Sequence, residues 1–71
     1  MNRINPNKLL HSKWTAAAPE NGEKHFLVVD LLRDDNDNVV QVVLEAVLTR
    51  RRITQPWRRL NNEQTWRFGW Q

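Results

Sequence analysis

Two segments rich in valine and leucine constrain the fold of this chain more than any other feature. They are HFLVVDLLR (residues 25–33) and VVQVVLEAVLTR (residues 39–50), and DDNDN separates them. The second segment also fits helical spacing, but its five valines favour a strand, because β-branched side chains lose rotamer freedom in a helix. Acid and amide residues such as those of DDNDN favour turns. The sequence therefore predicts a long antiparallel hairpin with strands at about 24–33 and 39–50.

The register of this hairpin decides which side chains face the core, because side chains alternate between the two faces of a strand. If Asp34 pairs with Val39, one face is apolar through its middle, and we expect it to form the core: Leu27, Val29, Leu31, Val40, Val42, Leu44, Ala46 and Leu48. The other face is mixed: Phe26, Val28, Asp30, Leu32, Gln41, Val43, Glu45 and Val47. A slip by one residue would carry Asp30 into the core.

Shorter signals predict the elements around the hairpin. Asn5-Pro6 is typical of a helix start, so we expect one short turn from Pro6 to Leu10. Residues 12–18 predict a third strand around Trp14, and Asn21-Gly22 is a strong hairpin-turn dipeptide.

After residue 52 the sequence predicts a short edge strand that contains Pro56, because proline cannot donate to a central ladder. Asn61-Asn62 resembles an N-cap and Gly69 a residue just past a helix end, which predicts a short C-terminal helix over about 62–68. The predicted fold is thus mainly β (α+β) in a single domain, residues 1–71. An SH3-like small barrel is the alternative.

Composition excludes several classes of function. The chain has no cysteine, which removes disulfides and zinc–thiolate sites, and we expect a cytoplasmic protein without a membrane segment. Its two histidines, His11 and His25, are far apart in sequence, so no metal is expected. Ser12 has no nucleophile elbow around it, and the two glycines form no phosphate loop. We therefore expect neither an enzyme nor a cofactor.

Charge is concentrated near the C-terminus. The net charge is +3, but residues 50–71 hold six of the eleven basic residues and one of the eight acidic ones. All six are arginines, interleaved with tryptophan in WRRLNNEQTWRFGW (residues 57–70). Rings that stack on bases and arginines that follow phosphates are what single-stranded nucleic acid requires. The candidate binding residues are Arg50, Arg51, Arg52, Arg58, Arg59, Arg67, Trp66 and Trp70.

The four tryptophans have to be divided between core and surface. A tryptophan buries about 150–250 Å², and the apolar face of the hairpin needs a cover that no long helix supplies. We expect Trp14 and Trp57 in the core, with Trp66 as the next candidate for burial. Trp70 should be exposed because it lies near a free end.

Several blocks in this order, NPNKLLHSKWTA, KHFLV, LEAVLTRR and PWRRL…W…GW, resemble the small bacterial tryptophan-rich proteins that are conserved and of unknown function. The resemblance spans the chain from Asn5 to Trp70. It implies a bacterial, cytoplasmic protein and supplies no activity, ligand or catalytic residue.

Three functions follow from these observations. The leading hypothesis is a small module that binds RNA or single-stranded DNA through the C-terminal arginines and tryptophans. The alternative is a protein-interaction module, with an acidic protein as partner, because tryptophan and arginine are also favoured interface anchors. An enzyme or small-ligand binder comes last. The sequence leaves the oligomeric state open.

Overall fold

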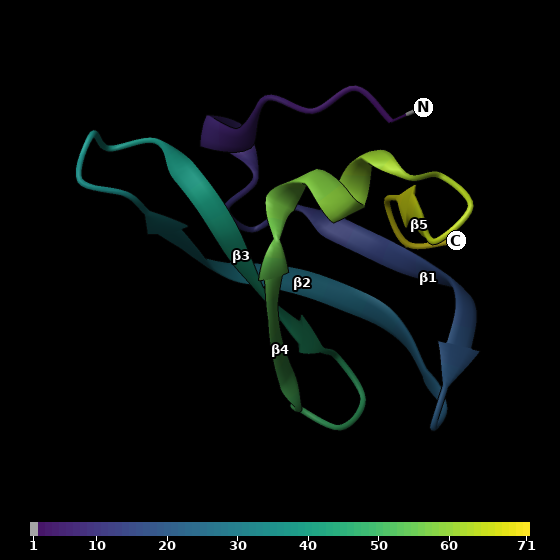
Figure 1. Ribbon diagram of the computed structural model, residues 1–71. Helices are drawn as coiled ribbons and strands as arrows, with labels where there is room; N and C mark the ends of the chain where they lie inside the picture. Colours follow the sequence, from purple (N-terminus) through teal and green to yellow (C-terminus); the bar gives the residue numbers. More distant parts are fainter. Residues whose placement is uncertain (1) are drawn as a thin grey trace.

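A single antiparallel sheet with strand order β4-β3-β2-β1-β5 forms the domain (Figure 1). The computed structural model describes residues 2–71. Its elements are η1 (Pro6–Lys8), β1 (Lys13–Glu20), β2 (Glu23–Arg33), β3 (Val39–Ala46), β4 (Arg52–Pro56), η2 (Trp57–Asn61) and β5 (Trp66–Phe68), where η marks a 3₁₀ turn. The mainly β fold, the long hairpin, the strand around Trp14 and the edge strand ending at Pro56 are confirmed.

The sheet is open, so the alternative of a closed barrel is wrong. β4 and β5 are its two edges and do not pair with each other. The sheet is nevertheless bent far enough that side chains of both edges line the same pocket. This near-closure brings the β4 segment close to the β5 segment.

The β2–β3 hairpin departs from its predicted register at two places, at Val29 and near the loop, where Arg33 rather than Asp34 pairs with Val39. Leu31 pairs with Val42, as the sequence predicts, but the register shifts at Val29, so that Val28 pairs with Leu44. This β-bulge inserts one extra residue into β2. It lets Val28 and Leu31 face the same side of the sheet, although three positions separate them.

The bulge corrects the predicted core of β2. Phe26 and Val28 are buried, and Leu27 and Val29 are only half-buried on the other side. On β3 the prediction holds at its centre, since Val42, Leu44 and Ala46 are all fully covered. Leu48, expected in the core, is exposed because β3 ends at Ala46 rather than at residue 50 and residues 47–49 form a turn. Val40 is exposed because the register shifts again between Leu32 and Arg33, so that Val39 pairs with Arg33 and is buried in its place.

The predicted C-terminal helix is wrong: residues 66–68 form strand β5. The side chain and carbonyl of Asn62 do cap a turn, accepting bonds from the backbone N–H groups of Gln64 and Thr65 at 3.0 Å. The chain then runs beside the free edge of β1, where Ala16 pairs with Trp66. A two-turn helix is marginal on its own, and pairing along β1 also suits the aromatic residues of this segment.

Turn residues behave as their chemistry predicts. Asn21 and Gly22 both have positive φ, 56° and 73°, which matches the right-handed twist of a tight hairpin. In the β2–β3 loop, Asp34 Oδ1 accepts the backbone N–H groups of Asn36 and Asn38, both at 2.9 Å. The Asn5 side chain caps the η1 turn by accepting the N–H of Asn7.

The core lies between the sheet and two segments that cover it. Leu9, which follows η1, and Leu60 of η2 belong to the buried core cluster. The two segments lie on one side of the sheet (Figure 1). Asn2 links the N-terminal segment to η2 and β5, since its Nδ2 donates to the carbonyls of Leu60 at 2.8 Å and Trp66 at 2.9 Å. The buried cluster consists of Leu9, Trp14, Phe26, Val28, Val42, Leu44, Ala46, Leu60 and Trp66.

Candidate functional site

The six candidate arginines do not form one patch. Arg50 and Arg52 bind Glu45, at 3.5 and 3.0 Å, on the outer face of the sheet, the face opposite the core. Arg51 points elsewhere and binds both carboxylate oxygens of Glu23 through its Nε, at 3.0 and 3.1 Å. The run of three arginines that leaves β3 is therefore divided between two acids and carries little free charge.

The arginines of η2 differ from this run. Arg58 and Arg59 form no ion pair within residues 2–71. The Arg58 guanidinium lies 5.1 Å from the centre of the Trp57 ring, a cation–π contact. Arg59 lines the pocket between the sheet edges. Arg67 lies apart from both, on β5 beside Thr15.

The tryptophans divide between core and surface: the expectations for Trp14, Trp66 and Trp70 hold, but the expectation that Trp57 belongs to the core is wrong. Trp14 is 1% exposed and Trp66 is 6% exposed, whereas Trp57 is only partly buried at the edge of the core. Trp70 is 43% exposed, yet it is not free.

Trp70 is held on the outer face by three contacts. Its Nε1–H donates to the Phe26 carbonyl at 3.0 Å. Its ring stacks on His25 with centroids 5.8 Å apart, and Lys13 Nζ lies 4.7 Å from the ring centre. Gly69, with φ of 82°, turns the chain from β5 onto this face. A base could stack on Trp70 only by displacing these neighbours, so its role as a stacking surface is weaker than the sequence indicates.

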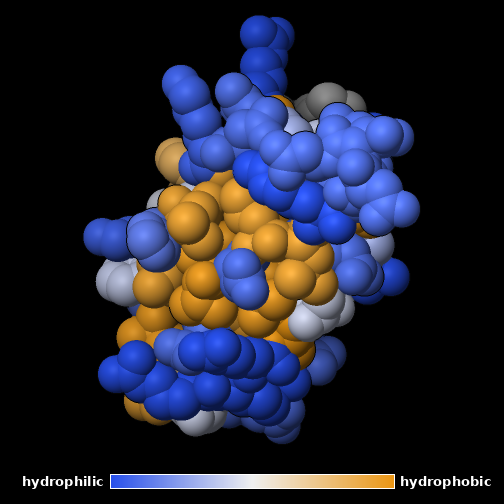
Figure 2. Space-filling view, turned by 90° about the vertical axis from the view of Figure 1, so that its left-hand side faces the viewer, coloured by the Kyte–Doolittle hydropathy of each residue, from blue (hydrophilic) through white to orange (hydrophobic). Residues whose placement is uncertain are grey.

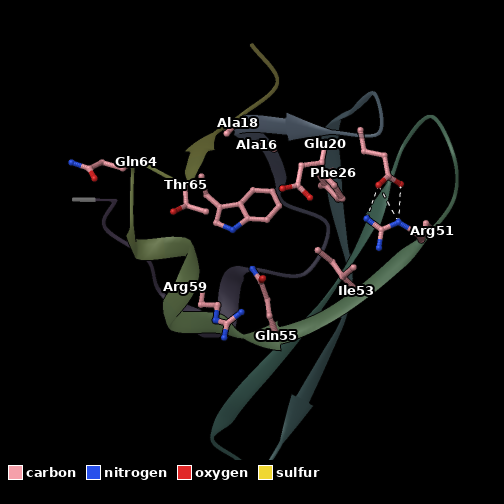
Figure 3. Close-up of a pocket in the computed structure, with 12 residues that line it drawn as sticks. Ala16, Ala18, Glu20, Phe26, Arg51, Ile53, Gln55, Arg59, Gln64 and Thr65 are labelled. Carbon is pink, nitrogen blue, oxygen red and sulfur yellow. Dashed lines mark hydrogen bonds and ion pairs between the residues drawn. The ribbon is translucent and has the colours of Figure 1, made fainter.

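A pocket of about 340 Å³ lies between β4 and β5 (Figure 3). Apolar side chains line part of it: Ala16, Ala18, Phe26, Ile53 and Trp66. Phe26 and Trp66 meet edge to face, with centroids 5.1 Å apart. Polar side chains form the rest: Glu20, Glu23, Arg51, Gln55, Arg59, Gln64 and Thr65. The volume lies within the usual range of small-ligand sites.

One wall of this pocket is an ion pair between a buried glutamate, Glu23, and a half-exposed arginine, Arg51. Glu23 is 3% exposed and accepts bonds from Arg51 and from the Thr49 hydroxyl. The hydrogen bonds from Arg51, and then from Thr49, hold the pKa of the Glu23 carboxyl below its usual range. The same pairing raises the pKa of Arg51. Glu23 is thus ionised at neutral pH and occupied by its partners.

Gln55 is the residue of this site that sequence reasoning missed. It lies on the inner face of β4, paired with Val42, and is 8% exposed. Its Nε2 is covered and has no hydrogen-bond partner within residues 2–71. Buried amides are nearly always bonded. The signal was present, since Gln55 follows Ile53 at the two-residue spacing of one strand face.

The outer face of the sheet carries apolar side chains without a cover. Register places Leu27, Leu32 and Val43 there, and Val29 joins them through the bulge. Figure 2, which views the molecule from the side of the β2–β3 hairpin, shows a broad apolar area bordered by polar and charged side chains. We call these four residues the outer apolar patch.

Two other kinds of functional element are absent from residues 2–71. No cluster of three or more histidine, aspartate or glutamate side chains is placed to hold a metal. Within that same range, no helix has the length and apolar character needed to cross a membrane.

Together these features define a small β domain with an open, bent sheet and a ligand-sized pocket between its edges. Residues 12–71 match the tryptophan-rich protein family DUF2389, and the chain belongs to that family. The resemblance noted in the sequence is thereby confirmed. Neither a curated protein nor a solved structure matches the chain.

Proposed function

We propose that this protein is a cytoplasmic, non-catalytic module that binds single-stranded nucleic acid along η2 and the adjoining pocket. One observation carries the proposal: Arg58 and Arg59 have no acidic partner within the described residues, and both lie beside aromatic rings. Arg58 lies over the Trp57 ring, and Arg59 lines the pocket that contains Phe26 and Trp66. Single strands bind where cations follow the phosphates and rings receive the bases.

The ion pairs favour Arg58 and Arg59, rather than the arginine run at 50–52, as the residues that bind phosphate. Each arginine of that run is bound to Glu23 or Glu45, so a phosphate would have to compete with a carboxylate. Arg58 and Arg59 are exposed and meet no such competition. Arg58 also lies over the Trp57 ring, which keeps its guanidinium near an aromatic surface.

Two matched double variants test the proposal. We expect a dye-labelled oligouridylate to bind the wild-type protein at low salt, with a log–log salt slope of about −0.7 for each contacted phosphate. Replacing Arg58 and Arg59 by Ala should weaken binding about tenfold or more and remove roughly 1.4 from that slope. Fluorescence anisotropy measures both quantities.

The control is the double variant Arg50→Ala/Arg52→Ala, which removes the same charge from the outer face. Its affinity should stay within about twofold of wild type, since those arginines are held by Glu45. Thermal melts show whether each variant is folded. Equal losses in both double variants would mean that net charge alone attracts the strand, and absence of binding at low salt would reject the function.

Protein–protein interaction is the second candidate function, and the outer apolar patch favours it. Contiguous exposed apolar surface commonly marks an interface. The patch is bordered by both bases and acids, among them Lys13, Asp30, Glu45 and Arg52, so a second copy of the chain could match it after a two-fold rotation.

Self-association tests this second candidate. Sedimentation velocity over a wide concentration range should show a dimer, and Val43→Lys, which places a charge in the outer apolar patch, should give a monomer. A protein that stays monomeric at all concentrations would reject the second-copy interface.

A further inference from the structure

The pocket between β4 and β5 contains hydrogen-bond donors that lack acceptors. The Gln55 amide nitrogen is covered and unpartnered, and the Trp66 indole N–H makes no hydrogen bond within residues 2–71. A buried donor without an acceptor costs free energy, whereas an apolar residue of similar shape at the same position would not. The covered Gln55 donor is therefore suited to a ligand that brings an acceptor.

The opposite side of the pocket offers an acceptor. Glu20 is exposed and belongs to no ion pair in the described part of the chain. Figure 3 shows Glu20 and Gln55 extending into the pocket from opposite sides, with Arg59 beside Gln55. A ligand that lies between them meets a donor on one side, a carboxylate on the other and a cation at the Gln55 end.

The remaining lining fits a planar group. Phe26 and Trp66 are aromatic, and Ala16 and Ala18 leave room above them because their side chains are small. Glu23 is not available as a second acceptor, because Arg51 and Thr49 occupy its oxygens. The polar pattern that a ligand meets is thus set mainly by Gln55 and Glu20.

We propose that this pocket receives a single base that carries an oxo group next to a ring N–H, which describes guanine, uracil and thymine. Gln55 Nε2–H donates to the oxo oxygen, Glu20 accepts the ring N–H, and Arg59 holds the adjoining phosphate. Adenine and cytosine place an amino group and a ring nitrogen acceptor at these positions, so donor would face donor and acceptor would face acceptor. This inference rests on the proposed function and adds base preference to it.

The test compares oligouridylate with oligocytidylate, and UMP with CMP. Both pairs keep the charge and the ring size constant. Uracil ligands should bind about tenfold or more tightly than cytosine ligands, the scale of discrimination that a two-bond base contact provides. In the wild-type protein, the side-chain amide resonance of Gln55 should shift on adding UMP and stay unchanged with CMP.

Gln55→Leu removes the donor at nearly constant volume. It should reduce the preference for uracil over cytosine to within about twofold, while the salt slope of oligouridylate binding remains that of wild type. Gln41→Leu is the matched control, because Gln41 lies on the outer face beside Leu32 and should leave the preference intact. The wild-type resonance shift decides the matter if the Gln55 variant does not fold.

The outcomes separate the two proposals. If strands bind with equal affinity for uracil and cytosine and still require Arg58 and Arg59, the base subsite is wrong and nucleic-acid binding stands. If UMP is preferred over CMP through Gln55 while no oligonucleotide binds, the subsite is supported and strand binding is wrong. A preference for uracil that survives Gln55→Leu also overturns the subsite.

Discussion

The two faces of the sheet contain similar apolar side chains but differ in how well other segments cover them. The inner face is covered by Leu9, Leu60 and Trp66, and its central residues Val42 and Leu44 are completely buried. The outer face presents Leu27 and Val43 half-buried. Its tryptophan, Trp70, arrives from the C-terminal tail and stays 43% exposed.

This difference shows that hydrophobicity alone does not assign a face. β2 contains apolar residues on both sides, and the bulge at Val29 decides which of them enter the core. The segments that contain Leu9 and Leu60 then cover the inner face, whereas the outer face carries ion pairs and the Trp70 ring. Substitutions on the inner face should therefore affect stability more than substitutions of the same type on the outer face.

The largest expected effect is on the inner face. Leu44→Ala should lower the free energy of unfolding by about 2–5 kcal/mol, because it removes a fully buried side chain and leaves a cavity. Gln41→Ala, on the outer face of the same strand, should change it by no more than about 0.5 kcal/mol. Urea denaturation measures both, and equal losses would contradict the assignment of the faces.

Trp70→Ala should have an intermediate effect of about 1 kcal/mol. The substitution removes the hydrogen bond to the Phe26 carbonyl and the stacking on His25, but the ring is too exposed to leave a cavity. This value exceeds the negligible change expected of a side chain that is exposed and makes no contacts. Thermal denaturation beside Trp14→Ala, which should cost about 3–5 kcal/mol, checks the ranking. A loss as large as that of Trp14→Ala would place Trp70 in the core.

The smallest effect concerns the two ion-pair clusters and depends on pH. The pKa values of Glu23 and Glu45 are both lowered, chiefly by hydrogen bonds from Arg51 and Arg52 respectively. The stability that they contribute is complete above the ordinary glutamate pKa of about 4.3, and it is lost as the pH falls through the lower folded values.

Glu23→Gln should flatten the acid side of the stability curve more than Glu45→Gln. Glu23 is 3% exposed and also bonds to Thr49, whereas Glu45 is 15% exposed and pairs with exposed arginines. Melting temperatures between about pH 3 and 7 measure the difference. The comparison fails if the Glu45 variant has the stronger effect.

Particular residues show what the sequence could and could not predict. The hairpin, the Asn21-Gly22 turn and the edge strand follow from local chemistry, and they were predicted. The bulge at Val29 depends on which side chains of β2 pack against the covering segments, and a local sequence pattern does not reveal this. β5 forms because β1 has a free edge beside it, and this partner is distant in sequence.

The candidate site was predicted less well, for a similar reason. The composition of the sequence shows the arginines, but only the tertiary structure shows that three of them form ion pairs with Glu23 and Glu45. Gln55 was overlooked although it follows Ile53 at the spacing of one strand face, because a polar residue on such a face does not by itself indicate a site. Its importance depends on the absence of a partner after folding.

The pairing of β1 with β5 also bears on how the chain folds during synthesis. Thr15 and Gly69, which are joined by a hydrogen bond, are 54 positions apart. A nascent chain can form the β2–β3 hairpin early, but β1 keeps an unpaired edge until the last strand has left the ribosome. Contacts of such long separation slow folding, and an exposed edge invites pairing with other chains. Loss of β5 through premature termination should therefore yield an aggregation-prone product rather than a smaller stable domain.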